Sequence, residues 1–176
     1  MSKRLLLCRH AKSSWKDPSL TDIARPLNRR GKQDAPLMGA WLHHQGIMVD
    51  AILASPAKRA RSTARKLARA IGFDRTGIIT LDVLYFGSGE EILLSLHHLP
   101  DPCEQVLVVG HNPTITDLAN RLGNLCIDNV PTCGIVGLEF ETASWEELAL
   151  RPGKPLFFEY PKHVRRDFPE DRIRPA

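Results

Sequence analysis

The sequence predicts an α/β domain with a largely parallel sheet, because short apolar runs alternate with longer stretches of helical periodicity. Continuously apolar runs are typical of strands that are covered on both faces. The chain has 176 residues, of which 43% are hydrophobic and 25% charged, a composition typical of a globular protein with one core. We therefore expect a single three-layer α/β/α domain over residues 1–160.

Six apolar runs are candidate strands. The run at 106–110 is the clearest, since it is continuously apolar and ends at a glycine, and the run at 78–81 is the weakest. The last run is expected at an edge of the sheet. The candidate strands lie at residues 5–8, 51–54, 78–81, 106–110, 134–140 and 156–160.

The first two long helices have recognisable ends. Asn28 is a candidate N-cap of a helix that runs to about residue 44, and Gly46 is its stop. Ser55 is the predicted N-cap of the second helix, with Pro56 at the first helical position and Gly72 as the stop.

The remaining helices are shorter. Asn112 and Pro113 predict the start of a helix that ends at Gly123, and a further helix is expected over 90–99. The last stretch, 161–176, is charged and has little apolar surface to bury. We expect it to be a surface tail that is partly flexible.

The net charge of +4 favours anionic partners without identifying one. Lys and Arg gather between Lys58 and Arg69, inside the second predicted helix. Such density is more typical of a solvated helix face than of a nucleic-acid interface, and no aromatic residue is interleaved for base stacking. We therefore expect no nucleic-acid partner.

No apolar run approaches the ~18 residues that span a bilayer, and the run before Arg9 is shorter than the core of a signal peptide. We expect a cytoplasmic protein with no membrane partner. The cysteines, at Cys8, Cys103, Cys126 and Cys133, show no CxxC pair, so they predict neither a disulfide framework nor a metal site.

Polar side chains follow three predicted strands at the point where each ends. Arg9 and His10 follow the first, Arg59 lies just after the second, and His111 follows the fourth. The carboxyl ends of parallel strands meet at one edge, where ligands bind in open α/β sheets. Guanidinium groups and helix starts favour a phosphate dianion. No aspartate cluster suited to a metal accompanies them, so we expect the protein to hold phosphate without a cofactor.

A neutral imidazole at such a site can attack phosphorus, and neighbouring arginines disfavour its protonation. His10 and His111 are thus predicted to divide two tasks: one attacks, and the other helps to hold the phosphoryl group. Lys12 and Ser13 are candidates for the mouth of the site. Arg25 is a candidate for a contact with phosphate.

Four segments in this order resemble the signature of the histidine phosphatase superfamily, whose members have the phosphoglycerate-mutase-like fold, and most closely its small SixA-type phosphohistidine phosphatases. Any one segment is weak evidence, but the order and approximate spacing of all four agree with the family. The segments are Leu7–Trp15, Asp22–Gly31, Ala54–Ala64 and Val109–Pro113.

The resemblance implies that His10 is the nucleophile that becomes phosphorylated, with Arg9, Arg59 and His111 as the phosphate pocket. It also implies a phosphatase that needs no metal and acts most readily on a phosphohistidine protein. Ala11 stands where the superfamily usually has glycine, a modest steric change.

The stretch 83–91 departs from the family pattern, because it has no carboxylate where many members carry a general acid. Glu90 and Glu91 come a few residues late. Two alternatives therefore stay open: a phosphatase of small phosphomonoesters in which Glu90 or Glu91 serves as the acid, and a phosphate-binding module without catalysis.

Overall fold

A computed structural model describes residues 2–100 and 102–167. Its six-stranded sheet has the order β3-β2-β4-β1-β5-β6, in which β1 to β4 run parallel, and β5 and β6 pair antiparallel with their neighbours. The strands are β1 (Lys3–Arg9), β2 (Ala51–Ala54), β3 (Ile78–Thr80), β4 (Gln105–Gly110), β5 (Ile135–Phe140) and β6 (Lys154–Glu159). The predicted α/β class is confirmed, and β6 lies at an edge as expected.

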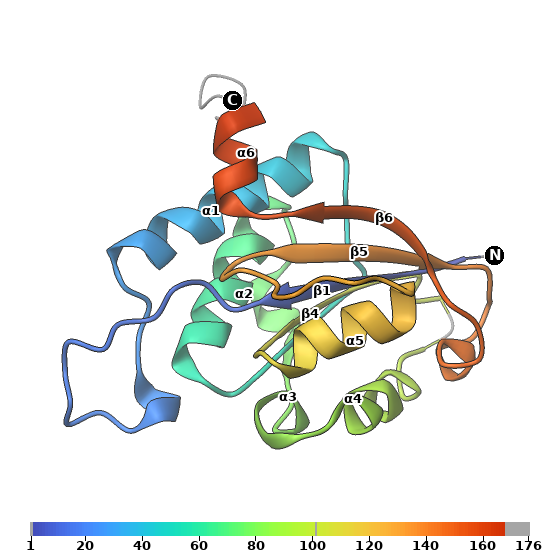
Figure 1. The fold of residues 1–176 in the computed structure, drawn as a ribbon, viewed down its shortest axis with the longest axis horizontal. Coiled ribbons are helices and arrows are strands. Elements are labelled where there is room, and N and C mark those ends of the chain that lie inside the picture. Colours follow the sequence, from blue (N-terminus) through green and yellow to red (C-terminus); the bar gives the residue numbers. More distant parts are fainter. Residues whose placement is uncertain (1, 101, 168–176) are drawn as a thin grey trace.

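Helices cover both faces of this sheet (Figure 1). One face packs against α1 (Arg29–His44), α2 (Lys58–Ala70) and α6 (Pro161–Asp167), and the other against α3 (Val83–Phe86), α4 (Gly89–Leu96) and α5 (Thr114–Gly123). Short 3₁₀ helices lie at η1 (Asp22–Ala24), η2 (Arg75–Gly77) and η3 (Trp145–Glu147). Alternate β1 side chains enter opposite cores, which explains why this strand is apolar at successive positions.

The helix starts agree only in part with the prediction. The Asn28 side chain accepts a hydrogen bond from the Gly31 N–H and caps α1, as expected. Ser55 does not cap α2, which begins at Lys58 after Ala57. Its hydroxyl instead accepts the Ala57 N–H, two residues along the chain, in a turn that precedes the helix.

The later helices also differ from the prediction. α5 begins at Thr114 after Pro113, and the Asn112 side-chain amide donates to Asn129 and Val130 and does not cap the helix. The helix expected over 90–99 is α4, which starts earlier, at a capping box between Ser88 and Glu91.

The expectation of a surface tail from residue 161 is wrong for its first part. Residues 161–167 form α6, which contacts α1. Val164 is fully buried, and Arg165 forms an ion pair with the buried Asp34 of α1. Pro161 and Val164 are three residues apart, so one helical turn presents both to the core. The rest of the predicted tail, 168–176, lies outside the described residues.

The four cysteines are free, and Cys8 is buried in the core. Within residues 2–100 and 102–167, no group of three or more His, Cys, Asp or Glu side chains is placed to hold a metal ion. None of the helices in these ranges combines the length and the hydropathy of a membrane-spanning segment.

The register of the central strands brings the predicted site segments together. Arg9 at the end of β1 lies opposite Gly110 at the end of β4, and Ala54 at the end of β2 lies opposite Val109. The His10 N–H continues this pairing and donates to the Gly110 carbonyl at 3.0 Å. The segments that follow β1, β2 and β4 therefore leave the sheet at one edge.

Candidate active site

His10 follows β1 directly and has a defined tautomer. Its Nδ1 lies 2.8 Å from the Ala11 carbonyl oxygen, which can only accept, so Nδ1 carries the proton and Nε2 keeps a lone pair. Burial lowers the pKa of His10 to about 3; the bond to Ala11 opposes this, while His111, Arg59 and Arg9 add to it. His10 is therefore neutral at pH 7, and burial contributes more than the arginines on which the sequence argument relied.

Arg59 lies in the first turn of α2 and is the centre of the polar network. Its Nε is 3.3 Å from His10 Nε2, and its Nη2 is 3.4 Å from His111 Nδ1. Its Nη1 donates to the Asp22 carbonyl at 2.6 Å and its Nη2 to the Asp22 carboxylate at 2.8 Å. Arg59 is only 4% exposed, whereas Arg61 is exposed.

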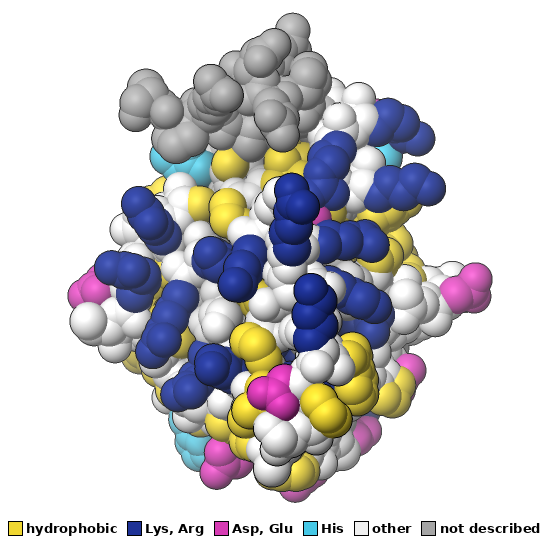
Figure 2. Space-filling view, turned by 90° about the vertical axis from the view of Figure 1, so that its left-hand side faces the viewer, with side chains coloured by type: hydrophobic (Ala, Val, Ile, Leu, Met, Phe, Trp, Pro, Cys, Tyr) yellow, Lys and Arg dark blue, Asp and Glu magenta, His cyan; other side chains and the backbone are white. Residues whose placement is uncertain are grey.

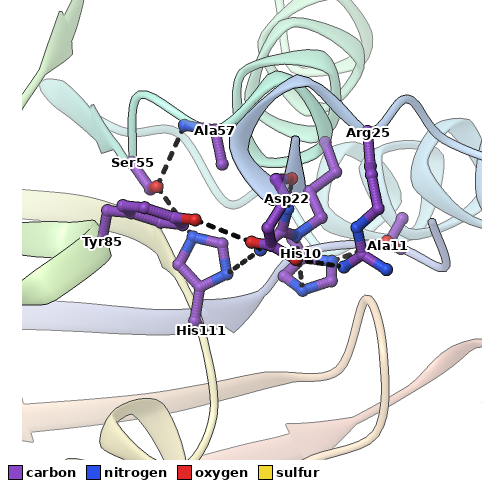
Figure 3. A network of polar contacts seen from close by, with 9 residues as sticks. His10, Ala11, Asp22, Arg25, Ser55, Ala57, Tyr85 and His111 are labelled. Carbon is purple, nitrogen blue, oxygen red and sulfur yellow. Dashed lines mark hydrogen bonds and ion pairs between the residues drawn. The ribbon is translucent and has the colours of Figure 1, made fainter. Parts of the chain in front are cut away.

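His111 follows β4 and faces His10, with ring centroids 4.9 Å apart (Figure 3). Arg59 donates to its Nδ1, so the proton lies on Nε2, which donates to the Ser55 hydroxyl at 2.7 Å. Burial, and then the charge of Arg59, lower the pKa of His111 to about 4. Ser55 thus orients the second histidine, a role that sequence reasoning missed.

Asp22, in η1, is a site residue that the sequence argument did not single out. Its carboxylate accepts from Arg59, forms an ion pair with Arg25 at 2.8 Å, and accepts the Tyr85 hydroxyl at 2.7 Å (Figure 3). Partial burial opposes ionisation, but the bonds from Tyr85 and Arg59 and the charges of both arginines lower the pKa of the carboxyl. Asp22 is therefore an anion between two guanidinium groups.

Tyr85 brings the stretch 83–91 into contact with Asp22. Tyr85, in α3, lies in the stretch where the resemblance implies a carboxylate, and its hydroxyl donates to the carboxylate of Asp22. Glu90 pairs with Arg121, and Glu91 caps α4, so neither enters the network. The suggestion that Glu90 or Glu91 supplies the acid is not supported by this geometry.

Arg25 joins the network through its ion pair with Asp22, while its predicted contact with phosphate stays a prediction. The side chain is buried, and its guanidinium carbon lies 3.4 Å from the centroid of the Trp15 ring. Its Nε and Nη1 have no hydrogen-bond partner among the described residues. Lys12 and Ser13 differ: the Lys12 side chain is exposed, and Ser13 pairs through its backbone with Leu27, so neither joins the network.

Arg9 is held by the loop between α5 and β5. Its Nη1 donates to the Asn129 side chain at 3.1 Å and to the Val130 carbonyl at 2.9 Å. Its Nε is buried and unpaired within the part of the chain that the structure describes. Buried N–H groups without partners are uncommon, and an anionic ligand would satisfy them.

Thr63 ties the loop after His10 to α2. The Ala11 N–H donates to the Thr63 hydroxyl at 3.0 Å, and this hydroxyl donates to the Arg59 carbonyl at 2.7 Å. The two bonds fix the Ala11 carbonyl, which orients His10, relative to the helix turn that carries Arg59.

Two neutral imidazoles beside guanidinium groups form a site whose charge and N–H donors suit a phosphate dianion. Residues 5–87 match the family model described as histidine phosphatase superfamily (branch 1). The chain is 33% identical over 156 residues to an uncharacterised chloroplastic protein of Arabidopsis thaliana, covering 84% of this chain and 71% of that one.

Solved structures of SixA-type phosphatases are similar to this chain. A candidate phosphohistidine phosphatase SixA from Agrobacterium tumefaciens is 28% identical, with a TM-score of 0.75, covering 90% of this chain and 98% of that chain. The protein histidine phosphatase SixA in complex with tungstate is 21% identical, with a TM-score of 0.79, covering 92% of this chain and 99% of that chain. The chain belongs to the histidine phosphatase superfamily, in its SixA-type branch, and is a phosphatase.

The low pKa values of His10 and His111 predict that neither imidazole takes up a proton between pH 8 and 5. In the unfolded chain both take up protons near pH 6.5, so the free energy of unfolding should fall as the pH drops from about 6.5 toward 4. NMR titration of the imidazole C–H signals, assigned with His10→Asn and His111→Asn, measures the pKa of each ring. A midpoint between pH 5.5 and 7 for either ring would contradict the account.

Proposed function

We propose that the protein hydrolyses phosphohistidine in other proteins through a covalent phosphohistidine on His10, without a metal ion, in the cytoplasm. The observation that carries the proposal is the state of His10: a neutral imidazole whose Nδ1 proton is bound by the Ala11 carbonyl, so that the Nε2 lone pair faces Arg59. A nucleophilic nitrogen in this state is what attack on phosphorus requires.

Phosphate binding rests on the guanidinium groups. Arg9 and Arg25 contribute buried N–H donors that lack partners among the described residues, and Arg59 lies between the two histidines. Such donors stabilise the charge that spreads over the phosphoryl oxygens in the transition state. Because arginines meet this charge, the proposed reaction needs no bound cation.

The reaction takes two displacements. His10 Nε2 attacks phosphorus while the bond to the substrate's imidazole breaks, and the substrate histidine leaves as a neutral ring when its other nitrogen is protonated. Water then attacks phosphorus, the bond to Nε2 breaks, and inorganic phosphate is released with the His10 imidazole restored.

The preference for phosphohistidine follows from the state of the nearby acids. An alkoxide leaving group needs a proton in the transition state, which general acid catalysis supplies at a gain of about 10²–10⁴-fold. The carboxyl of Asp22 is ionised and bound to two arginines, and the Tyr85 hydroxyl already donates to it. A leaving imidazole does not depend on such a donor.

One observation favours a second candidate, a phosphatase of alkyl phosphomonoesters. Asp22 places a carboxyl group in the network, and a phosphate dianion beside it would raise its pKa. A protonated Asp22 could then supply the proton that an alkoxide needs. This replaces the role that the sequence suggested for Glu90 or Glu91.

The proposed function predicts at least ~100-fold faster turnover of a phosphohistidine peptide than of a matched phosphoserine peptide or of sugar phosphates, by the factor that general acid catalysis contributes. The rate of phosphate release from each substrate measures this difference. Addition of a chelator should leave the rates unchanged. Faster turnover of the phosphoserine peptide or a sugar phosphate would favour the second candidate. Binding of all substrates without turnover would indicate a phosphate-binding module.

Asp22→Asn separates the two candidates. If Asp22 only positions Arg59 and Arg25, we expect a loss of no more than about tenfold that is similar for phosphohistidine and phosphoserine peptides, the size of one weakened charge-assisted bond. A loss of about 10²–10⁴-fold confined to the phosphoserine peptide would identify Asp22 as the proton donor. Asp17→Asn, in the same loop but bonded to Ser19, is the matched control and should change neither rate.

A further inference from the structure

The outer surface of α2 carries an unusual set of charges. The helix sequence KRARSTARKLARA contains no Asp or Glu. Apart from Arg59, which enters the active site, its cationic side chains are exposed or half-buried and form no ion pair with any described residue. These side chains are Lys58, Arg61, Arg65, Lys66 and Arg69.

This arrangement works against the stability of the helix. Arg61, Arg65 and Arg69 follow each other at intervals of four residues, where like charges repel. Lys58 stands in the first turn, at the positive end of the helix dipole, where an acid is favourable. α4 in the same chain follows the favourable pattern, with Glu90 in its first turn. Only Arg69, in the last turn, is favourable to the helix dipole, so helix stability does not explain the other charges on α2.

Three of these side chains, Arg65, Lys66 and Arg69, line a groove of about 580 Å³ between α1 and α2, which we call the α1–α2 groove. Every charged residue of its lining is a cation, and small apolar side chains make up much of the rest. The lining residues are Pro36, Ala40, Ser62, Arg65, Lys66, Arg69, Ala70 and Arg75. Lys and Arg also gather widely over one face of the molecule, where acidic side chains are few (Figure 2).

The α1–α2 groove and the active site share one rigid element. Arg59 and Arg69 are ten residues apart on α2, which is about 15 Å along a helix. An extended chain covers that distance in about five residues. When the phosphohistidine of a protein substrate lies at His10, a segment about five residues away in the substrate's sequence therefore reaches the α1–α2 groove.

We propose that the α1–α2 groove binds an acidic segment of the phosphorylated protein substrate, and this proposal rests on the proposed function. Carboxylates of the segment pair with Arg65, Lys66 and Arg69. The CH₂ groups of the segment's acidic side chains lie against Pro36 and Ala40. A protein segment fits better than a nucleic acid, because the lining has no aromatic side chain on which bases stack. Binding here raises the encounter rate of the substrate and leaves the chemical step unchanged.

The test uses two synthetic phosphohistidine peptides that differ only in a run of six residues placed five residues from the phosphohistidine. One peptide has glutamates in the run and the other has glutamines. We expect kcat/KM about tenfold higher for the glutamate peptide at low salt, since several exposed ion pairs of modest strength sum to that factor, and we expect the difference to vanish at 0.5 M NaCl.

The double variant Arg65→Glu/Arg69→Glu should lose this preference, while its turnover of phosphoramidate, which is too small to reach the groove, stays unchanged. Arg151→Glu/Lys154→Glu is the matched control, because it reverses two exposed cations that line a different groove. It should keep the preference. Equal rates for both peptides, or a preference that survives Arg65→Glu/Arg69→Glu, would overturn the proposal.

Direct binding keeps this test separate from the proposed function. The unphosphorylated glutamate peptide should bind the native protein more tightly than the glutamine peptide, and Arg65→Glu/Arg69→Glu should abolish the difference. This result together with no hydrolysis of phosphohistidine supports the groove and overturns the proposed function. Tighter binding of a single-stranded RNA than of the glutamate peptide would overturn the choice of an acidic protein segment.

Discussion

The site depends on one buried guanidinium group. Arg59 contacts His10 after β1, His111 after β4 and Asp22 in the loop between β1 and α1, so it joins three segments that are distant in the sequence. It can do so because β1, β2 and β4 end at one edge of the sheet and α2 starts there. The parallel sheet thus determines the separation of these groups, and Thr63 fixes the turn of α2 from which Arg59 extends.

Burial then decides the charges of the groups around Arg59. It keeps both imidazoles neutral, while Asp22 stays ionised because its hydrogen bonds and the two arginines outweigh its partial desolvation. The network therefore holds one carboxylate among guanidinium groups that also attract phosphate. A phosphoryl dianion would share or take over the bonds of Asp22, and the lone pair of His10 Nε2 would turn from the Arg59 N–H to phosphorus. Binding and activation of the nucleophile would thus occur together.

Much of the fold was predictable, since continuous apolar runs located each strand to within two residues of its observed start. The placement of Arg9, His10, Arg59 and His111 at one edge of the sheet was predictable, because these residues follow strand ends directly or open a helix. Asp22 was not, since its bonds reach Arg59, 37 residues away, and Tyr85, 63 residues away. The i,i+3 spacing of Asp22 and Arg25 was the local signal that could have drawn attention to it. α6 was missed because two apolar residues, Pro161 and Val164, suffice to anchor so short a helix.

The most direct test of the account is to trap the covalent intermediate on His10. The enzyme is mixed with phosphoramidate, quenched within milliseconds in alkaline denaturant, digested and examined by mass spectrometry and ³¹P NMR, with His10→Asn as the control. The account predicts a phosphoryl group on Nε2 of His10 that is stable in base and lost in acid, and none in the variant. A phosphoryl group on Nδ1, on Cys8 or on a serine, or turnover by His10→Asn at the native rate, would contradict it.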